Sequence, residues 1–547
     1  MAEAGAAVAY AAKNLVEGAA LLAKGVYDPT LPLKATLQPI KDVDVPQAFH
    51  TVSVIKGRAY AFGGKTLSKR GGEELADNDM HVIILPASGV ESTDYRRIEA
   101  TEEAPLRRWG HSAAVVDDRI YVFGGSGQDD GEPIDEQGRV WAFNTATNAW
   151  YALDPHPESK RPEPRSQHAS AASEHPQPTQ RPTGEGVAPQ MPMDPAKEVP
   201  EPPAPDTYGT IIIQGGKAKS GEQLHDIWAF DISSRTWAEL PSLPSPMSGS
   251  SSLAMTEKRI YAFARGQTSY MDLTPGNFDD RAGEGELGLT PLGPWCKLSS
   301  SATSEEETSH PGDRDGATLV PVTTGQGRNY LLLLGGQTPH GETLEDIWAL
   351  QLKPEGMTAA SVKDAARQAI RKDTGEMLWE EVKYYDSEGV MIQESQPGRG
   401  TGRRKGMAVA KGTEVDGASV VAWGGVGEDG KEWKEAHLHE YNDVTTVPEL
   451  ADEVTAEKMM LQRDIDVLWY VHVNVFLNFQ LAPGKTTPPG LSSGHLSATV
   501  KRLVEGESIK QHWGDIDLVV DGVVNKMPMT LMKGRPGLVQ ACPYLQS

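Results

Sequence analysis

The feature that most constrains this sequence is a pair of glycines that follows a short apolar segment and occurs five times. Glycine adopts backbone conformations that side chains hinder, so each pair lets a strand end and the chain turn away. Self-similarity of this kind is typical of repeat architectures. The five segments are AYAFGG, IYVFGG, IIIQGG, LLLLGG and VVAWGG, and a sixth copy, RIYAFARG, keeps only Gly266.

Each glycine pair belongs to a unit of four short strands. A strand-like stretch such as HTVSVI or HSAAVV precedes the pair, and a third strand such as RVWAFN or DIWAFD follows it. The fourth strand carries a tryptophan in four units, at Trp150, Trp237, Trp295 and Trp379. A four-stranded sheet cannot bury both faces by itself, but sheets arranged radially cover one another.

This pattern of apolar strand, glycine pair, D-x-W strand and tryptophan strand resembles the kelch repeat. The resemblance covers roughly residues 32 to 443. It implies an all-β fold, a six-bladed β-propeller similar to kelch and galactose-oxidase-like domains. The last unit supplies only three strands, so we expect LKATLQPI (Leu33–Ile40) to complete it and to join the two ends of the ring.

Three regions lie outside the repeat pattern. Residues 1–28 are predicted to form a short amphipathic helix, and residues 29–443 the propeller. Within the propeller, a proline-rich insert (176–206) separates two strands of blade three, and a helical insert (357–372) separates two strands of blade five. Residues 444–547 form an irregular C-terminal extension without a motif.

Composition excludes several classes of protein. The net charge of -24 argues against general binding to nucleic acid or to an anionic membrane. No run of eighteen apolar residues occurs, so we expect no membrane span. With two cysteines there is no disulfide framework, and we expect a cytoplasmic protein, with the nucleus as an alternative.

Arginines occur where the chain enters the first strand of several blades. Kelch propellers that bind acidic peptides use arginines at this point of the repeat, and a guanidinium group donates paired hydrogen bonds to a carboxylate or phosphate. A ring of arginines at the channel mouth therefore predicts an anion site. The alternative is that arginine belongs to the repeat itself and bonds backbone carbonyls. The residues are Arg108, Arg165, Arg314 and Arg403, with Gln47 in blade one.

A possible metal site lies in blade one. Glu73, Asp77 and His81 fit the spacing E-x-x-x-D-x-x-x-H, which resembles the iron-binding triad of plant specifier proteins. Two carboxylates and an imidazole suit Fe(II). However, Asp79 rather than Asp77 aligns with the repeat aspartates Asp226 and Asp346.

Other candidate sites are less specific. His50, His111 and His168 precede the first strands, and we expect buried, hydrogen-bonded repeat histidines rather than a metal set. Galactose oxidase chemistry is excluded, because Cys296 lies beside Trp295 on an outermost strand, far from the channel. No P-loop, nucleophile elbow or zinc pattern occurs.

The sequence therefore favours a binding or scaffold protein that recognises an acidic peptide or a small anion at the channel mouth. Two alternatives remain open. One is a small-molecule enzyme in the channel, either a specifier-like Fe(II) lyase or an isomerase of the mutarotase type. The other is a scaffold whose proline-rich insert docks to aromatic grooves.

Overall fold

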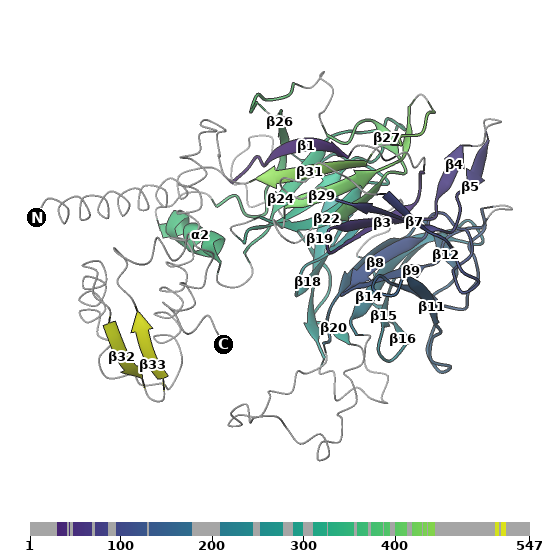
Figure 1. The fold of residues 1–547 in the computed structure, drawn as a ribbon, viewed down its shortest axis with the longest axis horizontal. Helices are drawn as coiled ribbons and strands as arrows, with labels where there is room; N and C mark the ends of the chain where they lie inside the picture. Colours follow the sequence, from purple (N-terminus) through teal and green to yellow (C-terminus); the bar gives the residue numbers. More distant parts are fainter. Residues whose placement is uncertain are drawn as a thin grey trace, which may run out of the picture. The chain divides into compact units, whose positions relative to one another are not determined.

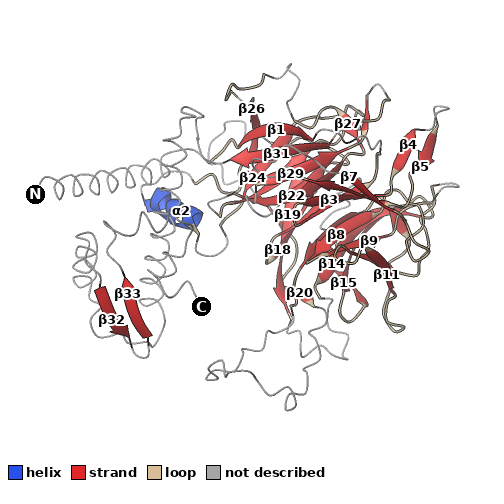
Figure 2. Ribbon diagram, in the orientation of Figure 1, coloured by secondary structure: helices blue, strands red, loops and turns tan. Residues whose placement is uncertain are grey.

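The computed structural model describes residues 30–442, apart from gaps of which the longest are 86–94, 178–207, 244–251, 277–287 and 299–309, and the segments 509–513 and 516–520. Nearly all described elements are strands, and α2 (Ala359–Ala369) is the one helix among the described residues (Figure 1, Figure 2). Contacts divide the chain into two units, and the larger one comprises Pro29–Ser361 and Asp373–Asp443.

The larger unit contains six antiparallel sheets, the blades, whose strands we give from the inside outward. Blade one is β2 (Thr51–Ile55), β3 (Arg58–Phe62), β6 (Met80–Ile84) and β7 (Tyr95–Ile98). Blade two is β8 (Ser112–Val116), β9 (Arg119–Phe123), β10 (Val140–Asn144) and β11 (Ala149–Leu153). Blade three is β13 (Ala169–Ser173), β14 (Thr210–Ala218), β15 (Gln223–Asp231) and β16 (Thr236–Leu240).

The other three blades follow the same plan. Blade four is β17 (Ser252–Met255), β18 (Arg259–Ala264), β19 (Gln267–Pro275) and the short outer strands β20 (Leu289–Pro291) and β21 (Cys296–Lys297). Blade five is β22 (Thr318–Thr323), β23 (Asn329–Leu334), β24 (Ile347–Gln351) and β25 (Trp379–Glu381). Blade six is β28 (Ala408–Lys411), β29 (Ser419–Trp423), β31 (Ala436–Asn442) and β1 (Lys34–Ile40).

The N-terminal strand closes the ring, as the sequence predicts. β1 pairs antiparallel with β31 over its whole length, from Lys34 opposite Asn442 to Ile40 opposite Ala436. In Figure 1 the purple β1 lies beside the green β31. β26 (Lys383–Tyr385) adds a parallel strand outside β1. Blade six therefore combines strands from both ends of the propeller sequence.

Burial between blades explains why six sheets are needed. The inner strands contact one another in a closed cycle, β2–β8–β13–β17–β22–β28–β2. Six apolar clusters lie between successive blades. The predicted fourth-strand tryptophans belong to these clusters. For example, the Trp237 ring packs 5.0 Å from the Phe123 ring of the preceding blade, measured between centroids.

The glycine pairs take the backbone conformation that the sequence predicts. In blade one, Gly63 and Gly64 have φ values of 65° and 95°. A Cβ atom on Gly63 would lie 2.6 Å from the Arg108 carbonyl oxygen of the next blade. Three short antiparallel pairings lie beside the glycine pairs. They are β4 (Lys65–Leu67) with β5 (Glu73–Leu75), β12 (Arg165–Ser166) with β14, and β27 (Arg404–Lys405) with β30 (Val426–Gly427).

The inserts fall between the predicted strands. The proline-rich insert (176–206) begins after β13 and ends before β14, and its residues 178–206 lie outside the described residues. The helical insert contains α2, between β24 and β25. The predicted helix within residues 1–28 lies outside the described residues, as does most of 444–547, where β32 (Ile509–Trp513) and β33 (Ile516–Val520) form an antiparallel pair.

Candidate functional site: the propeller channel and its upper mouth

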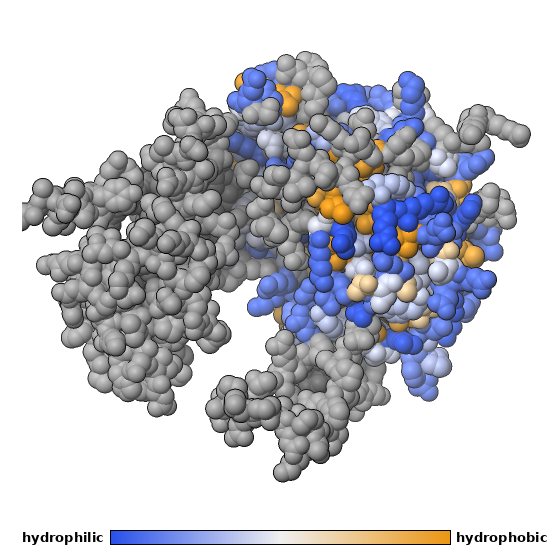
Figure 3. Space-filling view, viewed as in Figure 1, coloured by the Kyte–Doolittle hydropathy of each residue, from blue (hydrophilic) through white to orange (hydrophobic). Residues whose placement is uncertain are grey.

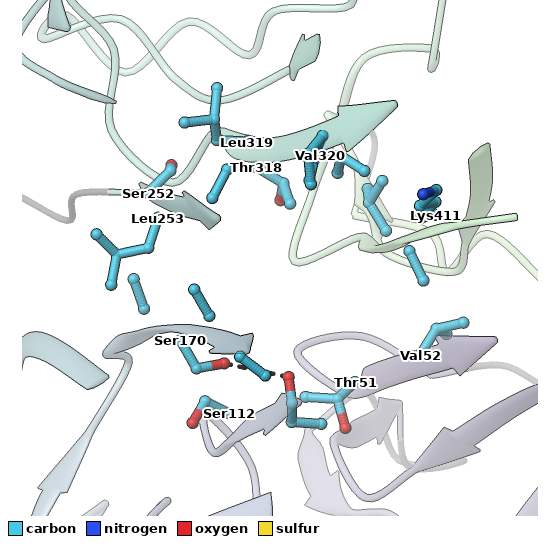
Figure 4. A pocket seen from close by; sticks show the side chains of 18 of the residues that line it. Thr51, Val52, Ser112, Ser170, Ser252, Leu253, Thr318, Leu319, Val320 and Lys411 are labelled. Carbon is cyan, nitrogen blue, oxygen red and sulfur yellow. Dashed lines mark hydrogen bonds between the residues drawn. The ribbon is translucent and has the colours of Figure 1, made fainter. Parts of the chain in front are cut away.

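The six inner strands enclose a channel of about 1800 Å³. Figure 4 shows small and hydroxyl side chains on its wall, among them Thr51, Ser112, Ser252 and Thr318. Small-molecule sites usually measure about 300–1,000 Å³, so this channel has room for a peptide segment. We call the end beside the glycine pairs the upper mouth, and the end beside the turns that join first and second strands the lower mouth.

The repeat arginines are buried and already paired. Arg165 is fully buried, and its two terminal nitrogens donate to the Asp226 carboxylate at 2.7 and 2.8 Å. The same guanidinium also donates to the carbonyl oxygens of Gly215 (3.1 Å) and Glu163 (3.0 Å). Arg165 therefore fastens the entry loop to the first glycine of the pair and to the third strand.

Two other arginines repeat this arrangement, which corrects the prediction of an open arginine ring. Arg108 pairs with Glu136 and bonds the Gly124 carbonyl, and Arg314 does the same with Asp346 and Gly335. Arg108 is 0% exposed and Arg314 only 4%. Their donors are used within the protein, so the alternative role, holding loops through backbone carbonyls, is the one the geometry gives them.

In blade six the predicted residue was wrong by one position. Arg404, not Arg403, donates to the first glycine of the pair, at 3.0 Å from the Gly424 carbonyl oxygen. Arg404 is buried, with its guanidinium 4.7 Å from the centre of the Trp433 ring. The Arg403 side chain is 60% exposed and lies 3.7 Å from Glu345. Two adjacent arginines made the two registers indistinguishable in the sequence.

Blade one departs from the arginine pattern. Gln47 stands in the arginine position, and the repeat aspartate Asp79 instead pairs with Arg97 of the outer strand β7. Asp77 lies nearby, 3.1 Å from Arg97 and 3.0 Å from the His81 Nε2 atom. The hydrogen bond from His81 is the main reason why the pKa of Asp77 is lowered.

The structure does not assemble the predicted metal triad. Asp77 and His81 are hydrogen-bonded to each other, but the Glu73 carboxylate pairs with Lys65 at 2.8 Å and is 53% exposed. The remaining His81 nitrogen, Nδ1, bonds the Tyr95 hydroxyl at 2.7 Å. Across the residues that the structure describes, no three His, Cys, Asp or Glu side chains form a metal-binding group. The prediction of Glu73, Asp77 and His81 as Fe(II) ligands is therefore corrected, because Glu73 does not join the other two side chains.

The repeat histidines are buried and hydrogen-bonded to the neighbouring blade, as expected for two of them. His111 Nε2 lies 2.9 Å from Thr51 Oγ1, and His168 Nε2 lies 2.8 Å from Ser112 Oγ. Burial lowers the pKa of His168 to about 3 and that of His111 well below its usual value. These side chains are neutral, and they join blades rather than bind a metal.

Phe49 marks the upper mouth because its backbone is unusual. Its φ is 56°, in the left-handed region where glycine is favoured. Equivalent positions hold Gly110, Gly316 and Gly406 with φ of 62–68°, and Gln167 with φ of 56°. Backbone hydrogen bonds join four of these residues along part of the mouth, from Phe49 N to Gly406 O (2.7 Å), Gly110 N to Phe49 O (3.3 Å) and Gln167 N to Gly110 O (2.6 Å).

Aromatic rings and a cation surround Phe49. The Phe49 and Trp109 rings meet edge to face with centroids 5.9 Å apart, and both side chains are half-buried. Lys65 Nζ lies 3.7 Å from the centre of the Trp109 ring and 5.9 Å from that of Phe49. A lysine above an aromatic face is a favourable cation–π contact. This part of the mouth offers both apolar surface and positive charge.

The two mouths differ in charge. Among the described channel-lining residues, the exposed charged side chains of the upper mouth are Lys217, Lys405 and Asp315. Those of the lower mouth are Lys56, Lys411, Asp117, Glu174 and Glu257. The upper mouth is thus net positive and the lower mouth net negative. The visible propeller face in Figure 3 is mostly hydrophilic with scattered apolar residues.

Comparisons with known proteins agree with this geometry. Residues 35–176 match the family model described as the KLHDC2/KLHL20/DRC7 Kelch-repeats domain. The chain is a kelch-repeat β-propeller protein. It is 32% identical over 112 residues to Kelch domain-containing protein 1 of Mus musculus, covering 20% of this chain and 23% of that protein.

Two further matches cover more of the kelch propeller. An F-box/kelch-repeat protein of Arabidopsis thaliana is 23% identical over 330 residues, 57% of this chain and 58% of its own length. The match to each of these two relatives spans less than two thirds of that relative's length. A solved structure entitled "Structure of YjhT" aligns over 73% of this chain and 95% of its own, at 13% identity and a TM-score of 0.39.

Among the described residues, the wall of the kelch propeller channel carries hydroxyl, small and aliphatic side chains together with the buried His50, His111 and His168. Its exposed charged side chains lie at the two mouths. Cys296 is exposed on β21 rather than facing the channel. The described part of the chain contains no helix long and apolar enough to cross a membrane.

Sequence reasoning missed the residues that distinguish the upper mouth of this kelch propeller. The unusual position of Phe49 can be recognised from the sequence, because alignment of the entry loops places it where three other blades have glycine. Lys217 and Lys405 had a weaker signal, because they stand at shared positions of the repeat whose residue type varies. Lys217 follows the glycine pair as Lys65 does, and Lys405 aligns with Trp109.

Proposed function

We propose that this kelch propeller is a protein-binding module that takes an acidic peptide segment at its upper mouth. The observation that carries this proposal is the contrast between the mouths. The upper mouth has two exposed lysines, Lys217 and Lys405, and one exposed carboxylate, Asp315, whereas carboxylates outnumber lysines at the lower mouth. In a chain of net charge -24, a positive mouth is a local exception that favours an acidic partner.

The size of the channel supports a peptide rather than a metabolite. Strands advance about 3.3 Å per residue, so a five-residue inner strand gives a wall about 17 Å long. An extended peptide end of about five residues matches that length. The repeat arginines support this function indirectly, because their ion pairs hold the loops that form the mouth.

The test is peptide selection with matched charge reversals. Immobilised full-length protein is panned against a random dodecapeptide library, and the enriched peptides become the probes. We expect enrichment of Asp and Glu, and at least tenfold weaker binding by the double variant Lys217→Glu/Lys405→Glu. The control, Lys56→Glu/Lys411→Glu, reverses two exposed lysines at the lower mouth and is expected to bind within twofold of wild type.

Two results would contradict the proposal. One is a library without enrichment of acidic residues. The other is equal loss of binding in both double variants, which would show an effect of overall charge rather than of the upper mouth. Thermal melts of all variants confirm that the propeller stays folded.

A further inference from the structure

We infer that Phe49 and Trp109 form an apolar subsite at the upper mouth, which takes an aliphatic or aromatic side chain next to the acidic residue of the bound peptide. This inference rests on the proposed function and adds a second recognition element to it.

Phe49 occupies an entry-loop position of positive φ that is glycine in three other blades and Gln167 in blade three. Three equivalent residues are glycines with positive φ, and a bulky residue in this region is a genuine outlier. Its backbone hydrogen bonds are also made by Gly110, so the ring closes without a phenylalanine at this point. Strained residues persist where the surrounding structure holds them, and they gather at ligand-binding sites. The Phe49 side chain therefore needs a reason beyond closing the ring.

The surroundings of Phe49 indicate what it contacts. Its ring lies against Gly406, where a Cβ atom would be only 2.8 Å from it, and edge to face with Trp109. Both aromatic side chains are half-buried, and Phe49 belongs to the channel lining, so part of the aromatic pair is open to the mouth. The neighbour of Gly406 is the exposed Lys405. An apolar side chain on the aromatic rings thus places the adjacent carboxylate of the same peptide near a lysine.

Charge complementarity selects the occupant. Lys65 stands over the Trp109 ring, but its charge is paired with Glu73 at 2.8 Å, whereas the exposed Lys405 directly precedes Gly406, whose carbonyl accepts from Phe49 N. An exposed cation beside an apolar patch disfavours a basic peptide and favours one in which a carboxylate flanks the apolar residue. The partner is therefore a peptide with an aliphatic or aromatic residue next to Asp or Glu.

The experiment repeats the library selection with two glycine variants. Phe49→Gly removes the ring and gives the position the residue that three other blades have. The control, Gln167→Gly, makes the same change at the equivalent position of blade three, which has the same φ of 56°. Wild type and Gln167→Gly are expected to enrich acidic peptides with an adjacent apolar residue. Phe49→Gly is expected to keep the acidic preference and lose the apolar one.

A double-mutant cycle separates recognition from folding. Replacing the apolar residue of a selected peptide by Ala is expected to weaken binding to wild type about tenfold, but binding to Phe49→Gly less than twofold. If Phe49→Gly does not fold, Phe49→Asn replaces it, because Asn tolerates the left-handed region. An apolar preference that survives in the variant, or acidic selection without any apolar preference in wild type, overturns this inference and leaves the proposed function standing. Absence of acidic selection in wild type means that the proposed function itself has failed.

Discussion

Blades two and three meet differently from blades six and one, although their backbones meet in the same way. At both junctions the second glycine of the pair donates to the next entry loop, Gly125 N to Arg165 O at 3.0 Å and Gly425 N to Gln47 O at 2.9 Å. The side chains differ. Ser112 bonds His168 at the first junction, whereas the equivalent strand position at the second junction is Ala408, which has no hydroxyl. The ring is thus set by backbone registry, and the side-chain bonds vary.

The junction of blades six and one carries buried polar groups without hydrogen-bond partners among the described residues. They are the Gln47 Oε1 atom, both ring nitrogens of His50 and the Trp423 Nε1 atom. His50 packs its Cε1 atom over Gly424, just as His168 packs over Gly124, and Ala408 holds the register position of Ser112. By this equivalence we expect the His50 Nε2 atom to face residue 408. Each unsatisfied buried group costs about 1–3 kcal/mol. This junction is held instead by apolar burial, with Trp423 fully buried.

The largest expected effect is acid destabilisation, and it tests whether the two junctions are equally buried. Burial lowers the pKa of both His50 and His168 to about 3. In the unfolded chain these groups take up protons near pH 6.5, so the unfolded state binds more protons as the pH falls from about 6.5 toward 3. Each histidine then lowers the free energy of unfolding by about 1.4 kcal/mol per pH unit. Stability is expected to be flat above pH 7 and to decline steadily below pH 6.

Denaturant unfolding at a series of pH values measures this decline. His50→Gln and His168→Gln should each reduce its slope by about one proton, and by the same amount. If only one of the two variants reduces the slope, the histidine at the other junction becomes protonated while the protein is folded.

The next largest effect concerns Arg165 in the entry loop of blade three. The entry loop of blade one has Gln47 in the equivalent position. Arg165→Ala leaves the Asp226 carboxylate and the Gly215 carbonyl without their buried donor, and breaking such a pair costs about 3–5 kcal/mol. Gln47→Ala is expected to cost less than about 2 kcal/mol, because Gln47 Oε1 accepts no hydrogen bond within the described residues. Urea unfolding compares the two, and equal losses would refute a structural role specific to arginine.

The sequence could predict the blades because their signals are local. A glycine pair, a tryptophan strand and the orphan segment Leu33–Ile40 each show their role within a few residues. The role of Arg165 depends on Asp226, which lies sixty-one residues later and meets it only through folding. Its position in the repeat was therefore clear, but whether it faces a ligand or a carboxylate of the same chain was not. The choice between Arg403 and Arg404 likewise depends on how β27 pairs with β30.

The smallest expected effect comes from exchanging the side chains Ser112 and Ala408, which distinguish the two junctions. This exchange tests the comparison most directly. Ala408→Ser places a hydroxyl where Ser112 has one, opposite His50, and a hydrogen bond of this kind contributes about 1 kcal/mol. Ser112→Ala makes the reverse change and leaves His168 in the state of His50, with a loss of about 1–2 kcal/mol. Ala169→Ser, at the corresponding first position of the inner strand in blade three, controls for an added hydroxyl away from both junctions. In differential scanning calorimetry, the Tm of Ala408→Ser should therefore be higher than that of wild type, and the Tm of Ser112→Ala should be lower. If Ala408→Ser instead lowers Tm, His50 does not face residue 408 in the way that His168 faces Ser112, and the junction of blades six and one is held by a different arrangement from the one its backbone shares with the rest of the ring.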